Sequence, residues 1–210
     1  MLKKFSREYL DIINSEFLGL NLTRIESYDD FYLKQVLDST LPFECMSISD
    51  SLDQCQVVLD IGFGGGFPLL PLALINPEQS FIGLEAREKK VKAVRSIASK
   101  LNILNVSVHH LRSEGVLIDL PTMITFKAVG MVTTCLKLLN VAAPCFVLCY
   151  KGPNYHQEEQ YDAPNGWKLI AEESIELPGV EGRVALLYEN VPRGTFKKYN
   201  KKLVKLSELI

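Results

Sequence analysis

A glycine-rich turn between two apolar segments constrains the fold of this 210-residue chain most strongly. Residues 57–71 read VVLDIGFGGGFPLLP: an apolar run ends near Asp60, glycines follow at positions 62, 64, 65 and 66, and an apolar pattern resumes at Phe67. This order predicts a strand, a tight turn and a helix. Glycine adopts positive φ and lets a ligand approach the backbone, and the first N–H groups of a helix lack partners. The turn is therefore predicted to bind a ligand.

The spacing of the glycines restricts what that ligand can be. A nicotinamide or flavin fingerprint requires a sixth-position glycine where this chain has Phe67, and no Lys-Ser or Lys-Thr follows to make a P-loop. A second acid, Glu85, comes 25 residues after Asp60 at the end of another apolar run. In a Rossmann-like sheet such an acid accepts hydrogen bonds from a ribose diol. The pattern resembles the S-adenosylmethionine site of class I methyltransferases.

Hydrophobic periodicity predicts an α/β fold behind a helical cap. Helical stripes over residues 5–17 and 28–41 precede the first strand and indicate an N-terminal cap within residues 1–50. Strands and helices then alternate in a domain predicted over residues 51–192. Strands are predicted at 57–61, 81–84, 106–111, 123–129 and 145–151, helices at 68–75, 88–101 and 132–139, and a closing hairpin-like pair of strands at 168–177 and 183–189. Together these elements predict a Rossmann-like methyltransferase fold with a mostly parallel, seven-stranded sheet.

Charge is distributed unevenly along the chain. The net charge is −2, but residues 193–210 carry +5 and the remainder −7. Such a basic tail is typical of a segment that touches phosphates, and equally of a solvated tail that keeps a protein soluble.

Other features indicate the protein's surroundings. Charges are mixed through the first 20 residues, no apolar run approaches the length of a membrane span, and the five cysteines show no CxxC spacing. We therefore expect a cytoplasmic protein without a membrane anchor, a metal site or disulfides, and separately from these features we expect a monomer.

Seven short motifs, in order along nearly the whole chain, resemble the glucose-inhibited division protein B family. They are NLTRI (21–25), LKQVLDS (33–39), VLDIGFGGGFPLLPLA (58–73), LEAREKKVKAV (84–94), LRSEG (111–115), FKA (126–128) and YKG (150–152). Members of that family are bacterial methyltransferases that modify N7 of a guanine in small-subunit (16S) ribosomal RNA. The resemblance implies S-adenosyl-L-methionine as cofactor and, as substrate, either free rRNA or the assembled 30S particle.

The resemblance also implies roles for individual residues. Glu85 is assigned to the ribose of the cofactor, and the 113–114 pair to its adenine side. The full set assigned to cofactor binding is Asp60, Gly62, Gly64, Gly66, Phe67, Glu85, Ser113, Glu114 and Lys127. RNA binding falls to Arg112, Lys151 and Arg183, and the charge of the tail adds Arg193, Lys197 and Lys198. Lys127 stands where the family has an arginine, and Gln35 where it usually has a histidine.

The implied reaction needs positioning more than proton transfer. Guanine N7 carries a lone pair and no proton, so Lys127, Arg112 and Arg183 are assigned to hold guanine O6 and phosphates, with no general base. Two other functions remain open from the residues alone. One is a Rossmann-like module that holds the cofactor or RNA without turnover, and the other is a small-molecule methyltransferase.

Overall fold

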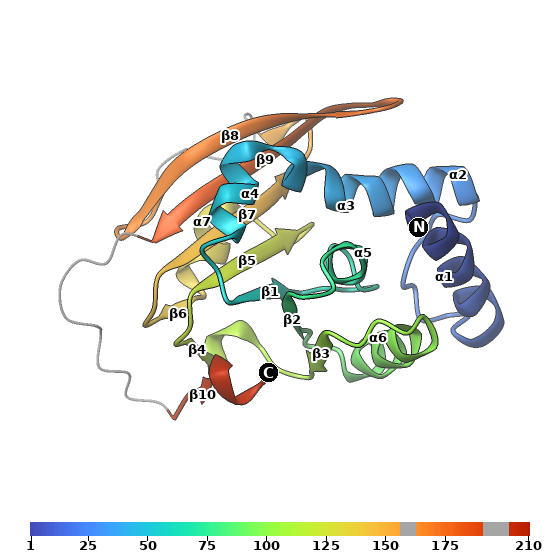
Figure 1. Cartoon of the computed structure of the whole chain (residues 1–210), viewed down its shortest axis with the longest axis horizontal. Helices are drawn as coiled ribbons and strands as arrows, with labels where there is room; N and C mark the ends of the chain where they lie inside the picture. Colours follow the sequence, from blue (N-terminus) through green and yellow to red (C-terminus); the bar gives the residue numbers. More distant parts are fainter. Residues whose placement is uncertain (156–162, 191–201) are drawn as a thin grey trace.

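The computed structural model describes residues 1–155, 163–190 and 202–210, in which helices pack on a seven-stranded sheet (Figure 1). The strand order is β3-β2-β1-β5-β7-β9-β8, and every neighbouring pair is parallel except those that β9 makes with β7 and β8. The strands are β1 (Val57–Ile61), β2 (Ser80–Leu84), β3 (Val106–His109), β5 (Thr122–Lys127), β7 (Cys145–Lys151), β8 (Trp167–Leu177) and β9 (Val180–Asn190). The predicted mostly parallel seven-stranded sheet is confirmed.

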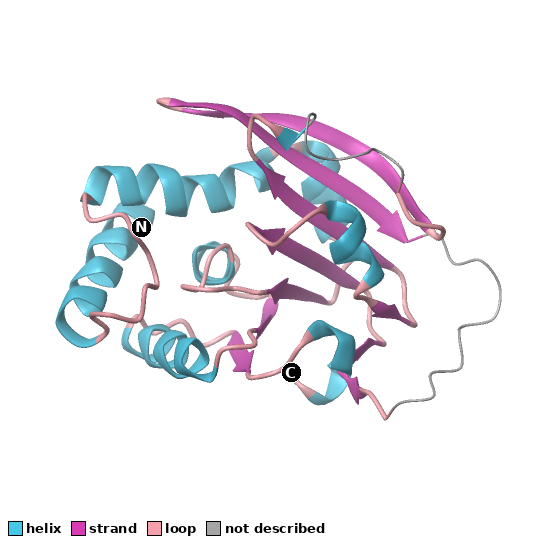
Figure 2. Cartoon of the chain, turned by 180° about the vertical axis from the view of Figure 1, so that it is seen from behind, coloured by secondary structure: helices cyan, strands magenta, loops and turns pink. Residues whose placement is uncertain are grey.

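Both faces of the sheet are covered, which explains why its central strands are apolar throughout. Side chains alternate between two hydrophobic clusters: Val58 packs with the cap and with α5 (Leu69–Ile75) and α6 (Glu88–Lys100), whereas Val57 and Leu59 pack with α7 (Val132–Lys137). The long β8–β9 hairpin forms one edge of the sheet (Figure 2).

The predicted N-terminal helical cap is also present. It consists of α1 (Leu2–Glu16), a continuous helical stretch and α4 (Met46–Leu52). The stretch contains α2 (Tyr28–Phe31), the π-helical η1 (Tyr32–Leu37), α3 (Asp38–Thr40) and the 3₁₀ turn η2 (Leu41–Glu44). The ring of Phe67, directly after the glycine turn, packs edge-on against Tyr9 and Phe31, with centroids 5.1 and 5.4 Å apart. The cap is thereby anchored on the glycine turn.

A second, three-stranded parallel sheet was not predicted. Its order is β10-β4-β6, from Val204–Lys205, Val116–Ile118 and Asn140–Val141, and η3 (Ser113–Gly115) and η4 (Leu206–Glu208) flank it. Strands of two or three residues are too short to leave a readable periodicity.

The end of the predicted basic tail packs on the domain. Leu206 is fully buried, and Ser207 donates hydrogen bonds from its N–H and its hydroxyl to the carboxylate of Asp119. Arg193, Lys197 and Lys198, which were assigned to RNA, lie outside the described residues.

Candidate active site

A cavity of about 560 Å³ opens at the carboxyl ends of the parallel strands. It lies beside β1, which has β2 on one side and β5 on the other, so the direction of the chain connections reverses there. Open α/β sheets bind their ligands in the crevice at such a switch point. The walls come from the glycine turn, the end of β2, the cap and the ends of β5, β7 and β9.

The glycine turn forms the floor of the cavity because its backbone follows a path that side chains would block. Gly62 has φ +74°, and a Cβ there would lie 3.0 Å from Cγ2 of Val129. The N–H of Gly64 donates to Oε2 of Glu85 at 3.1 Å, and the N–H of Arg87 donates to Oε1 at 3.0 Å. The Glu85 carboxylate is thus fixed at the cavity wall by two backbone donors, and each of its oxygens keeps a further acceptor site.

Asp60 supports this floor from beneath. Its side chain is almost fully buried and does not line the cavity. Oδ1 accepts a hydrogen bond from the Thr125 hydroxyl at 2.9 Å, and Oδ2 accepts one from the N–H of Leu69 at 3.2 Å. Asp60 therefore joins β1, β5 and the first turn of α5. Burial raises the pKa of this carboxyl to about 7.

We expect Asp60 to make stability depend on pH. In the unfolded chain the carboxyl ionises near pH 4, but in the folded protein its pKa is about 7. The stabilisation is complete below the unfolded value and is lost as pH rises through the folded one. The free energy of unfolding of the wild type, relative to Asp60→Asn, should therefore fall by about 2 kcal/mol between pH 5 and pH 7 and stay level above pH 8. Chemical denaturation of both proteins across this range measures it, and a constant difference would contradict the pKa.

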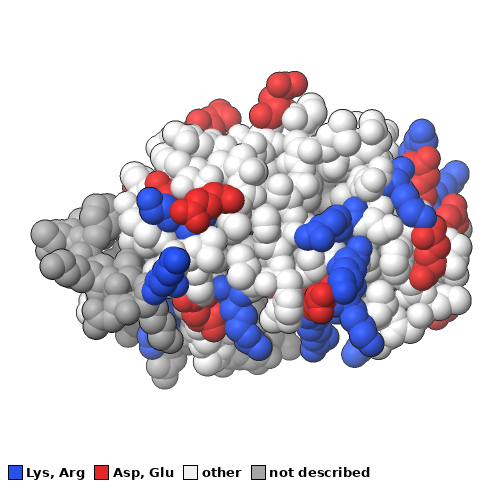
Figure 3. All heavy atoms as spheres, turned by 90° about the horizontal axis from the view of Figure 1, so that it is seen from below, with Lys and Arg blue, Asp and Glu red and all other residues white. Residues whose placement is uncertain are grey.

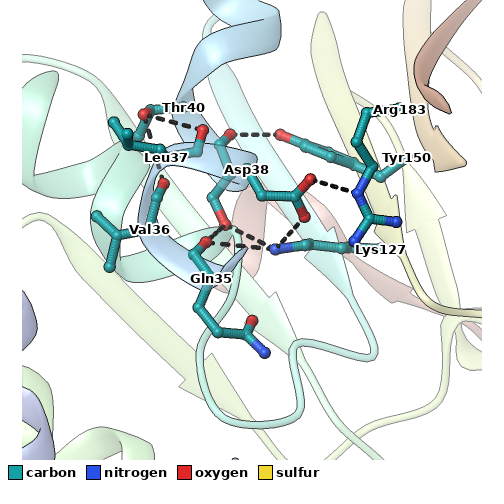
Figure 4. Close-up of polar contacts among 9 residues, drawn as sticks. Gln35, Val36, Leu37, Asp38, Thr40, Lys127, Tyr150 and Arg183 are labelled. Atoms are coloured by element: carbon teal, nitrogen blue, oxygen red, sulfur yellow. Dashed lines mark hydrogen bonds and ion pairs between the residues drawn. The ribbon is translucent and has the colours of Figure 1, made fainter. Parts of the chain in front are cut away.

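One buried carboxylate holds two cations at the wall of the cavity formed by the cap, β5 and β9 (Figure 4). Oδ2 of Asp38 lies 2.9 Å from Nζ of Lys127, and Oδ1 lies 3.0 Å from Nε of Arg183, the latter an ion pair without hydrogen-bond geometry. The Asp38 and Lys127 side chains are only 8% and 12% exposed, whereas that of Arg183 is 31% exposed. We call these three residues the Asp38 cluster.

Backbone and hydroxyl groups of the cap complete the surroundings of Lys127. Its Nζ donates to the Ser39 hydroxyl at 3.1 Å and to the carbonyl oxygen of Gln35 at 3.3 Å, and the Tyr150 hydroxyl donates to the Ser39 carbonyl at 2.7 Å (Figure 4). Burial lowers the pKa of Lys127, and the neighbouring Asp38 charge opposes that shift. Asp38 therefore favours the protonated lysine, which donates hydrogen bonds and cannot accept a proton.

The structure brings together only part of the predicted site. The predicted residues that line the cavity are Gly62, Gly64, Phe67, Glu85, Lys127, Lys151 and Arg183. Those that do not line it are Asp60, Gly66, Arg112, Ser113 and Glu114. Arg112 is exposed on the loop after β3, and the Ser113 hydroxyl donates to the Glu114 carboxylate.

Several lining residues were missed as site residues, namely Leu22, Asp38, Gly65, Lys90 and Tyr150. For Asp38 a signal was present, because it follows two apolar helical residues, Val36 and Leu37, inside a motif already recognised. An acid in that position needs a buried partner, but the pattern does not say which one.

Among residues 1–155, 163–190 and 202–210, no three His, Cys, Asp or Glu side chains gather as metal ligands. Within the same ranges, no helix combines the length and the apolar character of a membrane span.

The sequence of this chain is similar to those of a known protein family. Residues 2–182 match the family model of rRNA small subunit methyltransferase G. Ribosomal RNA small subunit methyltransferase G from Solibacter usitatus is 35% identical over 177 residues, covering 81% of each chain. The protein of the same name from Marinobacter nauticus is 32% identical over 184 residues, covering 85% of this chain and 81% of that one.

Solved structures agree with this chain in fold. A SAM-dependent methyltransferase from Aquifex aeolicus, 16% identical, covers 74% of this chain and 92% of its own with a TM-score of 0.53. A variant of MtNAS in complex with S-adenosylmethionine, 14% identical, covers 90% of this chain and 73% of its own with a TM-score of 0.51. The predicted class I methyltransferase fold is thereby confirmed. From the family match and these relatives, the chain belongs to the glucose-inhibited division protein B (GidB) family, that of rRNA small subunit methyltransferase G, as its motifs predicted.

Proposed function

We propose that this protein transfers a methyl group from S-adenosylmethionine to N7 of a guanine in small-subunit (16S) ribosomal RNA. The observation that carries the proposal is the cavity at the switch point of the sheet, which is lined both by the glycine turn with Glu85 and by the Asp38 cluster. One wall has the features of a cofactor site, and the other presents cations to an acceptor. The names of the relatives support the choice of RNA.

The residues at the first wall fit an adenosyl cofactor. Glu85 is held by backbone donors with acceptor sites remaining for ribose hydroxyls. Gly62 and Gly64 keep the floor free of side chains, and Phe67 with Leu22 gives the cavity an apolar boundary. When bound, S-adenosylmethionine supplies an electrophilic methyl group on a sulfonium.

The second wall fits an acceptor that has no proton to lose. Lys127, whose ammonium form is favoured by the neighbouring Asp38 carboxylate, can donate a hydrogen bond to guanine O6. Guanine N7 needs no base, whereas an amino nitrogen must lose a proton in the course of methylation. Arg183 and Lys151 lie at the same wall, where they can bind phosphates flanking the base. The protein contributes orientation of the two reactants, which can lower the activation barrier by several kcal/mol.

A transfer assay with mapping of the product tests the proposal. We expect tritium from labelled S-adenosylmethionine to enter small-subunit rRNA, as naked RNA or as 30S particles from cells without this gene, in the form of N7-methylguanine. Glu85→Ala should weaken cofactor affinity about 10- to 100-fold, since a hydrogen bond to a charged group contributes about 1.5–3 kcal/mol.

A matched variant and two contrary outcomes complete this test. Glu78→Ala, which removes an exposed acid from the turn between α5 and β2, should bind the cofactor as the wild type does. Cofactor binding without transfer to RNA would indicate a non-catalytic module. Label confined to metabolite extracts would indicate a small-molecule methyltransferase.

A further inference from the structure

An exposed basic face beside the cavity mouth lies on α6 and on the loops that flank it. Residues 87–100 contain six basic residues and one acid, Glu88. Figure 3 shows this concentration of positive charge over α6, whereas the neighbouring region at the α1 end of the molecule mixes both signs. Its members are Arg87, Lys89, Lys90, Lys92 and Arg95, together with Arg112 after β3, and we call it the α6 face.

The fold of the α6 face explains why it stays exposed. Val91, Val94 and Ile97 are buried against the sheet, so the charged positions lie on the exposed side of the same helix, where Arg95 also donates a hydrogen bond to the Val108 carbonyl oxygen at 2.6 Å. Lys92 pairs with Glu88 in an exposed contact that contributes little to stability. Within the described residues, the side chains of Arg87 and Lys89 form no ion pair. Their positive charges are therefore available to an anion.

The α6 face reaches the cavity at one end and the exposed Arg112 at another. Lys90 lines the cavity, with its Nζ 3.9 Å from the position of a Cβ built on Gly64. Nε2 of His110 and the carbonyl oxygen of Ala86 are 2.9 Å apart. This contact joins the loop after β3 to the segment that precedes α6. A polyanion that extends from the Asp38 cluster across the opening of the cavity would therefore contact α6.

We infer that the α6 face binds the phosphate backbone of the substrate RNA beside the acceptor guanine. The inference rests on the proposed function, and it adds a contact surface that extends from Lys90 at the cavity to the exterior of α6. It also accounts for the predicted RNA-binding role of Arg112. This residue does not line the cavity but lies at the end of the α6 face. Phosphate contacts of this kind fix orientation on the RNA without reading its sequence.

Salt-dependent binding to an in vitro transcript of small-subunit rRNA tests the inference. The test variant is Arg87→Gln/Lys89→Gln. The matched control is Lys137→Gln/Lys168→Gln, which removes the same charge from exposed positions on α7 and β8. Each lost phosphate contact should make the negative slope of log affinity against log salt shallower by about 0.7, and should lower affinity at 0.15 M salt about fourfold. For the test variant, the negative salt slope should therefore be shallower by about 1.4 and the affinity roughly 15-fold lower, while the control matches the wild type.

Three readouts separate the outcomes. Calorimetry with S-adenosylmethionine should give wild-type affinity for both variants, because neither pair of side chains lines the cavity. Suppose that the wild type methylates rRNA but the test variant keeps the wild-type salt slope, or that the salt slope becomes shallower by the same amount in both variants. Either result would overturn the inference about the α6 face and leave the proposed function standing. A wild type that neither binds nor methylates rRNA overturns the proposed function and this inference with it.

Discussion

Replacing Asp38 with asparagine is expected to destabilise the protein by about 3–5 kcal/mol and to reduce methyl transfer to background. The carboxylate forms ion pairs with both Lys127 and Arg183, at 2.9 and 3.0 Å. Removing one partner of a buried ion pair leaves the other charge uncompensated, and Lys127 is only 12% exposed. Burial then acts on the pKa of Lys127 without the opposing Asp38 charge, so the lysine releases its proton more readily. A neutral amine positions a guanine O6 less well than an ammonium group does.

Two comparisons identify charge as the cause of this loss. Asp53→Asn makes the same substitution at an exposed residue that directly follows α4 and should change the free energy of unfolding by less than about 0.5 kcal/mol. Adding Lys127→Met to Asp38→Asn removes the uncompensated lysine and should recover part of the stability, because an apolar side chain tolerates burial there. Transfer activity should stay absent in the double variant. Urea unfolding together with the tritium assay measures both effects, and an Asp38→Asn protein with wild-type stability would show that the cluster is not electrostatically coupled.

The sequence predicted those features of the fold that short stretches of chain determine. The strand at 57–61 and the strand at 145–151 were placed with the bounds that the structure has. Both are apolar runs that end at a glycine turn or at charged residues, so each carries its own signal. The helix α4, by contrast, was missed, because its seven residues MSISDSL include three serines and leave only a short apolar stripe.

The site was predictable to the extent that its residues follow strands. Glu85 and Lys127 lie at the ends of β2 and β5, and parallel strands bring their carboxyl ends to one edge of the sheet. Asp38 comes from the cap, 89 residues before Lys127, and nothing in the local pattern sets how the cap docks. Asp60 illustrates the opposite case. Its position in the glycine motif suggested ligand contact, but its two oxygens are directed at Thr125 and Leu69 within the protein.

Docking of the cap depends on one glycine that the ligand-binding pattern did not single out. Gly65 lies against residues of the cap: a Cβ built on it would come within 2.4 Å of the Leu22 carbonyl oxygen and 3.2 Å of the Tyr9 hydroxyl. The Tyr9 hydroxyl in turn donates a hydrogen bond to the Gly65 carbonyl oxygen. Because the nearest obstacle is backbone, no side-chain rotation can relieve the contact. The close approach of two chain segments, not a positive φ, requires glycine here.

Gly65→Ala is therefore expected to separate the cap from the glycine turn. Overpacking of this kind costs roughly 1–3 kcal/mol, and the shift also widens a cavity that Leu22 and Gly65 both line. We expect a lower melting temperature, weaker S-adenosylmethionine binding and faster amide hydrogen exchange in α1. Gly115→Ala is the matched control, since no atom lies within 4 Å of its Cβ position, and it should behave as the wild type. If Gly65→Ala kept wild-type stability and slow exchange in α1, the cap would not be held by this contact, and the wall that carries Asp38 would have to be positioned by the Lys127 and Arg183 ion pairs alone.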